Sequence, residues 1–525
     1  MVLLALVAVV LLLVCSNLAA LLLVRSVERS REAGMRLAIG ASRGAIARQF
    51  LTESLLLAIA GGAIGWGLAA AVQRVLLSML DSAGAGVARQ SRLDVAVFAF
   101  CFAVSLLAGL LFGLLPAWRA SRVDPLAAIR GSISSAPGHR SILASALIAG
   151  QIALSLALLF GAGLFTQTLR HLRAIDLGFD PENVVFIHVD DQGHAQSAPA
   201  FFRELLRRAR ELPGIRAVSL TGHPPLLNAM GAVTIQIPGM APPSRGSYNT
   251  ASVTGISDGY FRTLGVPLIA GRDFDSNDRD DGAEMPVIVD QEFARKFFGG
   301  DALGKPFTYG ARKPARVIAV AQNAKYRFLR EDAAPSMYVV VAQRPVASLY
   351  LQVRSSEDPA ATIERLRSLV HAIDRSVPID SAATMEMQID QSLSRERMLA
   401  FLSTLLGGIS VALAAIGLYG VLAFSVSRRT REIGIRMAVG AGRGGILAMI
   451  LRESVWMVAA GIAAGIPLAF LWGRLASTLL YGLKPQDTET AIMATLSLAV
   501  AALLAALLPA WRAAKVDPMV ALRSE

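Results

Sequence analysis

The sequence predicts a multi-pass α-helical membrane protein with seven spans and a large α+β extracytoplasmic domain. Hydrophobic residues make up 54% of the 525 residues and are concentrated in blocks, which excludes an ordinary soluble protein. Two stretches of similar sequence lie 400 residues apart, which indicates an internal repeat. Between the repeats, roughly 230 residues alternate β-type runs with amphipathic helices, which is typical of a folded α+β domain.

Seven apolar runs are long enough to cross roughly 30 Å of hydrocarbon at about 1.5 Å per helical residue. They are 2–24, 54–77, 95–117, 142–166, 399–424, 454–477 and 490–510. A signal peptide is the rival interpretation of the first run, but no basic segment precedes it and the run is longer than a signal peptide needs.

None of these runs carries a mid-membrane Asp, Glu, Lys or Arg, the groups that usually mark an ion or proton pathway. Asn17 and Gln151 are the conspicuous amide side chains inside the runs. We expect them to form interhelical hydrogen bonds rather than a transport site.

The distribution of Arg and Lys predicts the orientation in the membrane. One group of loops holds 19 of these residues and the other holds 3. The first group is 25–50, 118–140, 426–452 and the tail 511–525, and the second is 79–94 and 479–489. By the positive-inside rule the first group is cytoplasmic, so residues 167–398 lie outside the cytoplasm. The net charge of +12 follows these loops without a basic, aromatic-interleaved patch, and we expect no nucleic-acid partner.

The first repeated phrase covers residues 29–54 and 428–454. Its shared positions are Arg29, Glu32, Gly34, Arg36, Gly40, Ala41, Arg43 and Glu53, which recur as Arg429, Glu432, Gly434, Arg436, Gly440, Ala441, Arg443 and Glu453. An ordinary cytoplasmic loop that fixes topology is the simpler interpretation. Orientation requires Arg and Lys, however, and not the same Glu and Gly positions twice.

The first half of each copy has the spacing of a helix with two faces. Arg429, Glu432 and Arg436 fall at i, i+3 and i+7 and predict one charged stripe, while Ile433 and Met437 lie on another side. Glu432 and Arg436 also stand in the favourable i, i+4 order. We expect a helix at the membrane–water boundary, ended by the glycines at 440, 442, 444 and 445.

A second phrase, at 114–131 and 507–525, also occurs twice. Its shared positions are Pro116, Trp118, Arg119, Asp124, Pro125 and Arg130, which recur as Pro509, Trp511, Arg512, Asp517, Pro518 and Arg523. The Trp is placed where a span reaches the interface, and Asp-Pro is expected to open a short amphipathic helix.

These boundaries predict five segments. They are a first three-span repeat at 1–131, a cytoplasmic linker at 132–141, a leading span at 142–166, an outer α+β domain at 167–398 and a second three-span repeat at 399–525. The second unit has a leading span and an outer domain, whereas the first begins inside a span. We therefore expect the chain to lack the N-terminal part of a longer duplicated protein.

Within the outer domain, 184–190, 285–290, 315–320 and 348–353 are predicted strands, and 201–214 and 359–374 are predicted amphipathic helices. Both cysteines, Cys15 and Cys101, fall inside spans. The outer domain must therefore rely on its apolar core rather than on disulfides.

The sequence contains little that indicates an enzyme. Residues 299–306 have the glycine and lysine spacing of a P-loop, but Pro306 replaces the Ser or Thr that binds Mg²⁺, so we expect a turn between a helix and a strand. The six histidines form no recognisable metal-site motif. The acidic run 273–281 lacks the glycine and terminal Glu of an EF-hand. No catalytic or metal site is expected.

The phrases at 431–446, 507–523, 260–274 and 290–307 resemble those of MacB/FtsX-type permeases of ABC transporters. The two repeats are more narrowly similar to the duplicated permeases of that group found in acidobacteria and related bacteria. The resemblance covers nearly the whole chain and implies that the outer segment is a MacB-like periplasmic core domain. Residues 142–525 follow the family's order completely, whereas residues 1–131 match only its last three spans.

The resemblance implies a permease in the bacterial cytoplasmic (inner) membrane that transmits motion from a cytoplasmic ABC ATPase dimer. ATP would be bound by that partner and not by this chain, which would carry no cofactor of its own. The residues that match the ATPase-coupling helices are Arg29, Glu32, Gly34, Arg36, Gly40, Arg429, Arg431, Glu432, Gly434, Arg436 and Gly440. Further expected partners are membrane lipid, a second permease copy, and a periplasmic adaptor or outer-membrane channel.

Two function classes remain open. The first is an export permease for a small hydrophobic molecule, a peptide or a lipoprotein. The second is a non-transporting transmitter, in which the same motion activates a periplasmic enzyme or signals envelope stress. They share the coupling helices and differ in what the outer domain touches.

Overall fold

The computed structural model describes residues 7–17, 36, 42–81, 99–100, 102–103, 137–190, 198–227, 231–237, 249–275, 277–278, 284–310, 314–330, 334–341, 348–439 and 441–515. Contacts divide the chain into two compact units. One unit contains the long apolar helices, and the other, which includes Leu172–Arg395, contains the sheet.

Five helices of the described residues are long and apolar enough to cross a membrane. They are α2 (Arg43–Asp81), α5 (Pro137–Arg173), α11 (Ser394–Arg428), α13 (Arg443–Leu475) and α14 (Thr488–Ala514). Five predicted spans coincide with these helices. Of the predicted span 2–24, the structure describes a shorter apolar helix, Val7–Asn17. Most of the predicted span 95–117 lies outside the described residues.

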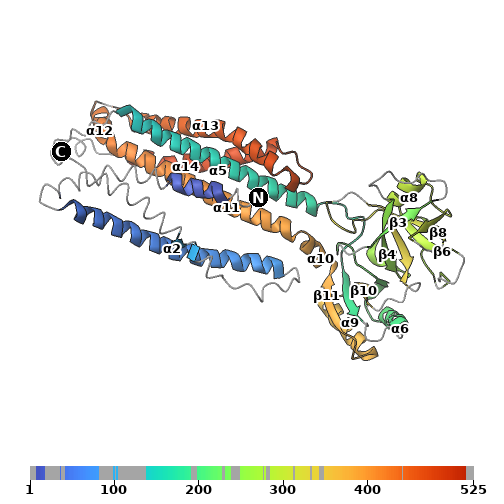
Figure 1. Ribbon diagram of the computed structural model, residues 1–525. Coiled ribbons are helices and arrows are strands. Elements are labelled where there is room, and N and C mark those ends of the chain that lie inside the picture. The colour runs from blue at the N-terminus through green and yellow to red at the C-terminus, as the bar shows by residue number, and fades with distance from the viewer. Residues whose placement is uncertain are drawn as a thin grey trace. The chain divides into compact units, whose positions relative to one another are not determined.

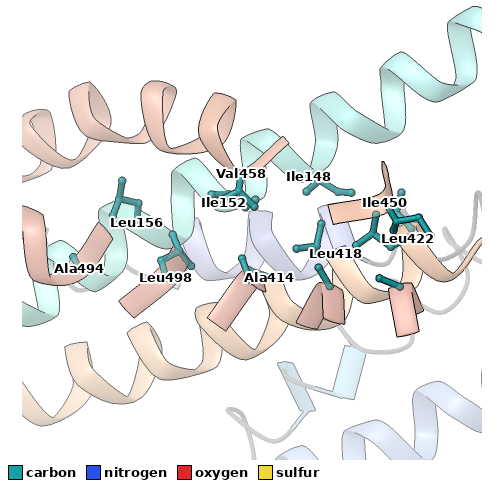
Figure 2. Packing of buried hydrophobic residues seen from close by; sticks show 14 of the residues in the cluster. Ile148, Ile152, Leu156, Ala414, Leu418, Leu422, Ile450, Val458, Ala494 and Leu498 are labelled. Atoms are coloured by element: carbon teal, nitrogen blue, oxygen red, sulfur yellow. The ribbon is translucent and has the colours of Figure 1, made fainter. Parts of the chain in front are cut away.

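Helix α5 occupies the centre of the helical unit. Two-thirds of its apolar window is buried (67%), against 33% or less for α11, α13 and α14. Figure 1 shows these four helices running alongside one another. Figure 2 shows apolar side chains from all four meeting in one core, with Ile152 of α5 close to Val458 and Ala414.

Small residues allow α5 and α13 to approach closely. A Cβ on Gly461 would lie 2.6 Å from the Ile152 Cβ, and a Cβ on Gly465 would lie 3.0 Å from the Ala153 Cα. The two glycines are four residues apart on one face of α13, the spacing that lets helix backbones pack tightly in lipid. Ser155 adds a hydrogen bond from its Oγ to the Ser410 carbonyl of α11, at 3.1 Å.

The sheet unit has two lobes built on one sheet of eleven strands among the described residues. In the first lobe the strands run in the order β11-β1-β10-β2, with helices following β1 and β10, which is a split βαβ arrangement. Its elements are β1 (Val184–Asp190), α6 (Ala198–Arg210), β2 (Ile215–Thr221), β10 (Ser348–Ser355), α9 (Pro359–Ile373) and β11 (Ile379–Thr384). Apolar residues of α6 and α9 share one buried cluster with β1, β2 and β10.

The second lobe is inserted between β2 and β10. Its elements are β3 (Gly231–Gln236), β4 (Thr250–Ile256), α7 (Tyr260–Leu264), β5 (Leu268–Gly271), β6 (Met285–Asp290), α8 (Gln291–Phe298), β7 (Pro306–Tyr309), β8 (Pro314–Ala321) and β9 (Ser336–Val340). The path β4-β3-β7-β8-β6-β9 closes because β9 also pairs with β4. The closed ring encloses an apolar core and leaves few free strand edges.

The predicted strands 184–190 and 285–290 are confirmed as β1 and β6, and 315–320 and 348–353 lie within β8 and β10. The predicted helices are confirmed as α6 and α9, although α6 ends at Arg210 because the following residues turn into β2. Helix α10 (Met385–Ser392) then precedes α11.

Candidate functional site

The second copy of the repeated phrase forms a short helix between two of the long ones. Helix α12 (Thr430–Ala438) follows α11 after Arg429 and is separated from α13 by residues 439–442. The expected helix is therefore present but shorter than predicted. Gly444 and Gly445, which we expected to help end it, instead lie in the first turn of α13.

One side of α12 is fixed to the helical core. Ile433 is 1% exposed and belongs to the main buried cluster, and Met437 packs against that cluster. The other side is open, because Ile435 is 47% exposed and Val439, just after the helix, is 84% exposed. An apolar side against the bundle and a second side left accessible match the two-faced pattern of the sequence.

Glu432 and Arg436 form the predicted i, i+4 ion pair on α12, at 2.6 Å. Both side chains are about half exposed, at 52% and 47%, so the pair contributes only a few tenths of a kcal/mol to the helix. Gly434 lies in the same helix, as does the backbone of Arg431, whose side chain is outside the described residues together with Gly440.

Arg429 departs from the predicted charged stripe. It occupies the cap position before α12 rather than a helical one, and its Nη1 donates to Glu453 Oε2 of α13 at 3.0 Å. The Arg429 guanidinium thus connects the start of α12 to α13 instead of continuing the row of Glu432 and Arg436. A shallow depression beside this pair is lined by Leu422, Ser425, Val426, Arg429, Ile433, Met449, Ile450 and Glu453.

The same cross-helix contact is found in both repeats. Arg436 Nη1 lies 2.8 Å from Met449 Sδ of α13, and Arg36 Nη1 donates to Gln49 Oε1 of α2 at 2.7 Å. Positions 36 and 49 correspond to 436 and 449 after the displacement of 400. In each copy the arginine reaches the helix that follows it. Of the other predicted residues in the first copy, Arg29, Glu32, Gly34 and Gly40 lie outside the described residues.

The second repeated phrase is described only in part. Trp511 is 54% exposed near the end of α14, with the Lys515 ammonium 3.6 Å from its ring centroid, and Arg512 Nη1 donates to the Tyr419 hydroxyl of α11 at 2.9 Å. This contact ties the end of α14 to α11. The remaining predicted residues, Trp118, Arg119, Asp124, Pro125, Asp517 and Pro518, lie outside the described residues.

We call the sheet unit the outer unit, because the sequence predicts that it lies outside the cytoplasm. The stretches of this unit that resembled enzyme motifs have structural roles. Residues 299–306 form the predicted turn between α8 and β7, with Gly299, Gly300 and Gly304 at positive φ. Asp278 accepts two hydrogen bonds from Arg272, which lower the pKa of its carboxyl. No cluster of acidic, His or Cys side chains suited to a metal ion occurs in the part of the chain that the structure describes.

Sequence reasoning missed a buried carboxyl in the outer unit. Asp290 is 1% exposed at the end of β6, where it caps α8 by accepting a hydrogen bond from the Phe293 N–H at 2.7 Å. Burial raises the pKa of Asp290 to about 7. The signal in the sequence was an Asp that ends an apolar strand and precedes a helix, which indicates a helix cap.

Comparison with known proteins gives two family matches. The FtsX-like permease C-terminal model matches residues 4–125 and again 404–518, and the MacB-like periplasmic core domain model matches residues 143–369. The double match of the first model corresponds to the internal repeat, and the second model covers most of the sheet unit.

Several curated relatives carry export-permease names. The macrolide export ATP-binding/permease protein MacB of Escherichia coli is 30% identical over 295 residues, which cover 52% of this chain and 44% of that protein. MacB 1/2 of Paracoccus denitrificans is 33% identical over 287 residues, which cover 52% and 42%. The matched region therefore spans less than half the length of these relatives.

A solved structure of the periplasmic region of MacB from Actinobacillus actinomycetemcomitans is 18% identical, covers 42% of this chain and 94% of that one, and has a TM-score of 0.27. One family model thus matches two segments of the chain, and the other matches the segment between them. The chain belongs to the family of FtsX-like ABC transporter permeases with a MacB-like periplasmic core domain.

Proposed function

We propose that the chain is the permease subunit of an ABC exporter in the bacterial inner membrane. In this proposal a separate cytoplasmic ATPase dimer docks on the two copies of the first repeated phrase and its motion is transmitted to the periplasmic domain. The seven predicted spans, with residues 167–398 outside the cytoplasm, would place the outer domain on the periplasmic side. The macrolide-export names of the relatives support export of a small hydrophobic molecule, and a peptide or a lipoprotein is the alternative cargo.

The observation that carries the proposal is the two-sided attachment of α12. Ile433 fixes one side to the bundle and the Arg429–Glu453 pair fixes its start to α13, so a force applied to α12 reaches two long helices. The accessible side presents Glu432 and Arg436 beside Ile435. An apolar contact rimmed by charges is the usual composition of a protein docking surface.

The proposal places ATP binding outside this chain. The stretch that resembles a P-loop lies in the outer unit and forms a turn between α8 and β7. Its Pro306 begins β7 and has no hydroxyl for Mg²⁺. ATP hydrolysis in the partner would then drive the cycle.

The experiment exchanges the two charges of α12. Affinity purification of the full chain from cross-linked cells should recover an ABC ATPase, identified by mass spectrometry. The double variant Glu432→Arg, Arg436→Glu keeps an ion pair on the helix but inverts the charges offered to the partner, so recovery should fall by about tenfold or more if each close charge pair contributes about 1 kcal/mol.

The matched control exchanges an exposed i, i+4 ion pair of the outer unit, Asp301→Lys with Lys305→Asp. It should leave recovery unchanged. Equal recovery from the α12 variant, or no ABC ATPase recovered with the unaltered chain, would refute the docking proposal.

A further inference from the structure

Two buried amide side chains meet at one glycine inside the helical unit. Asn17, on the helix Val7–Asn17, is 4% exposed, and Gln151 of α5 is 2% exposed. A Cβ on Gly417 of α11 would lie 2.4 Å from Asn17 Oδ1 and 2.7 Å from Gln151 Oε1. Only a glycine at this position leaves room for both amides, so three helices come together at a single point.

Asn17 is held there by a hydrogen bond. Its Nδ2 donates to the Leu413 carbonyl of α11 at 2.8 Å, which confirms the interhelical bond expected from the sequence. Asn17 Oδ1 and Gln151 Nε2 are both buried without a hydrogen-bond partner. One is an acceptor and the other a donor, and both lie against Gly417. In an apolar interior each unpaired group costs about 1–3 kcal/mol, which favours their pairing with each other.

The positions of these residues in the repeats add a second, independent observation. Asn17 and Gly417 are related by the displacement of 400 that relates Arg36 to Arg436, and the two matches to the permease model begin at residues 4 and 404. Equivalent positions of two copies touch each other when a twofold axis passes between the copies. The contact of Asn17 with Gly417 is therefore the contact expected on such an axis.

The neighbouring packing agrees with a specific interface. Leu13, one turn before Asn17, is fully buried and shares a cluster with Leu158 of α5 and Trp472 of α13. Leu11 and Leu12 are more than half exposed. The face of the helix Val7–Asn17 that carries Leu13 and Asn17 thus packs against α5, α11 and α13 of the second permease unit.

We propose that Asn17, Gln151 and Gly417 form a polar lock through which the first repeat docks on the second unit of the same chain, at a pseudo-twofold axis. Asn17 Nδ2 donates to the Leu413 carbonyl of α11, the proposed bond of the lock runs from Gln151 Nε2 of α5 to Asn17 Oδ1, and Gly417 supplies the space. The lock fixes how the two repeats are aligned with each other. It thereby also fixes the relative placement of the two copies of the first repeated phrase. It does not depend on which partner binds those copies.

Cysteine cross-linking in membranes tests the placement. In a chain without Cys15 and Cys101, Asn17→Cys with Gly417→Cys should form a cross-link within one chain under mild oxidation or with a short bifunctional reagent. The control pair is Asn17→Cys with Gly408→Cys. Gly408 is nine residues earlier in α11, which is half a helical turn out of phase and about 13 Å away along the axis. No cross-link above this control, or a cross-link between two chains, overturns the proposal.

Fragment retention tests the lock itself. A protease site placed at 132–141 divides the purified chain, and the two fragments should stay together in mild detergent. Gly417→Ala should lower the retained fraction, because its Cβ would collide with both amides, whereas Gly408→Ala should not, because nothing lies within 4 Å of the added Cβ.

Hydrogen bonding is separated from steric fit by a double-mutant cycle. Asn17→Leu removes the acceptor proposed for Gln151 Nε2 and should weaken retention by about fivefold to thirtyfold, the range of one buried amide bond of about 1–2 kcal/mol. Adding Gln151→Leu should recover part of that loss. Strictly additive losses would show that the two amides do not interact and would refute the lock.

Discussion

Arg429 donates from Nη1 to Glu453 Oε2 of α13 at 3.0 Å, and so spans the segment with α12 that separates α11 from α13. The two side chains are 45% and 32% exposed. Ion pairs with this exposure contribute about 0.2–1 kcal/mol. The pair therefore orients the start of α12, while the buried Ile433 supplies most of its attachment.

The first prediction compares these two contributions. Ile433→Ala removes a buried side chain, a change that costs about 2–5 kcal/mol in a packed core. It should greatly accelerate amide hydrogen exchange over 430–438, measured by mass spectrometry on the full chain. Arg429→Ala should have a much smaller effect.

The control for Ile433→Ala is Ile435→Ala, which makes the same chemical change at a residue of α12 that is 47% exposed. Its exchange should stay close to that of the unaltered chain. Equal acceleration by both Ile variants would mean that α12 is not anchored through Ile433.

The second prediction concerns the packing of α13 on α5. Gly461→Ala would place a Cβ 2.6 Å from Ile152 Cβ and 2.9 Å from the Ala149 carbonyl oxygen. Overpacking of this kind costs about 1–3 kcal/mol. The thermal unfolding temperature of the purified chain in detergent should fall.

Gly445→Ala, on the same helix with nothing within 4 Å of the new Cβ, is the matched control. It should leave stability unchanged or raise it by up to about 1 kcal/mol, since alanine favours helix over glycine. A similar loss from both variants would show that the contact with α5 does not cause it, because helix propensity alone predicts a gain at both positions.

The spacing of residues along the chain predicted the features that depend only on neighbours in the sequence. The i, i+4 rule gave the Glu432–Arg436 pair, and strand-type runs gave β1 and β6. The pairing of Arg429 with Glu453 could not be read in this way, because 24 residues separate them and the contact exists only once α11 and α13 are packed. The closed strand ring depends likewise on β4 pairing with β9, which lies about 80 residues further along the chain.

The amide lock was only half visible in the sequence. Asn17 and Gln151 stand out because amides are costly inside apolar spans, but a glycine in a span has many possible roles. The role of Gly417 becomes evident only in the structure, where it lies against both amides. Gly461 and Gly465 are a similar case. The sequence shows their spacing, but it does not show that α5 is the helix that packs against them.

The third prediction concerns membrane orientation. In a chain without Cys15 and Cys101, an impermeant maleimide should label His371→Cys in intact spheroplasts but not Val439→Cys, because the positive-inside rule places the outer unit and α12 on opposite sides. Both side chains are exposed. Permeabilised cells provide the control, in which both positions should react. Labelling of 439 but not of 371 in intact spheroplasts would reverse the orientation.

The last prediction uses the buried carboxyl of Asp290. Burial raises its pKa from an ordinary value near 3.8 to about 7. Between about pH 4 and pH 7 the folded state keeps a proton that the unfolded chain has released. Stability from this group is therefore fully present below about pH 4 and is lost as the pH rises through about 7, by up to about 4 kcal/mol for roughly three pKa units.

Asp290→Asn should remove this dependence, because the amide does not titrate while its oxygen still accepts the Phe293 N–H and caps α8. Scanning calorimetry of the full chain in detergent between pH 5 and pH 8 should show an outer-unit transition that falls less with pH in the variant. Asp358→Asn, which changes the exposed cap of α9, controls for the loss of a carboxylate at a cap. Parallel pH curves for Asp290→Asn and the unaltered chain would show that the Asp290 carboxyl does not titrate in this range.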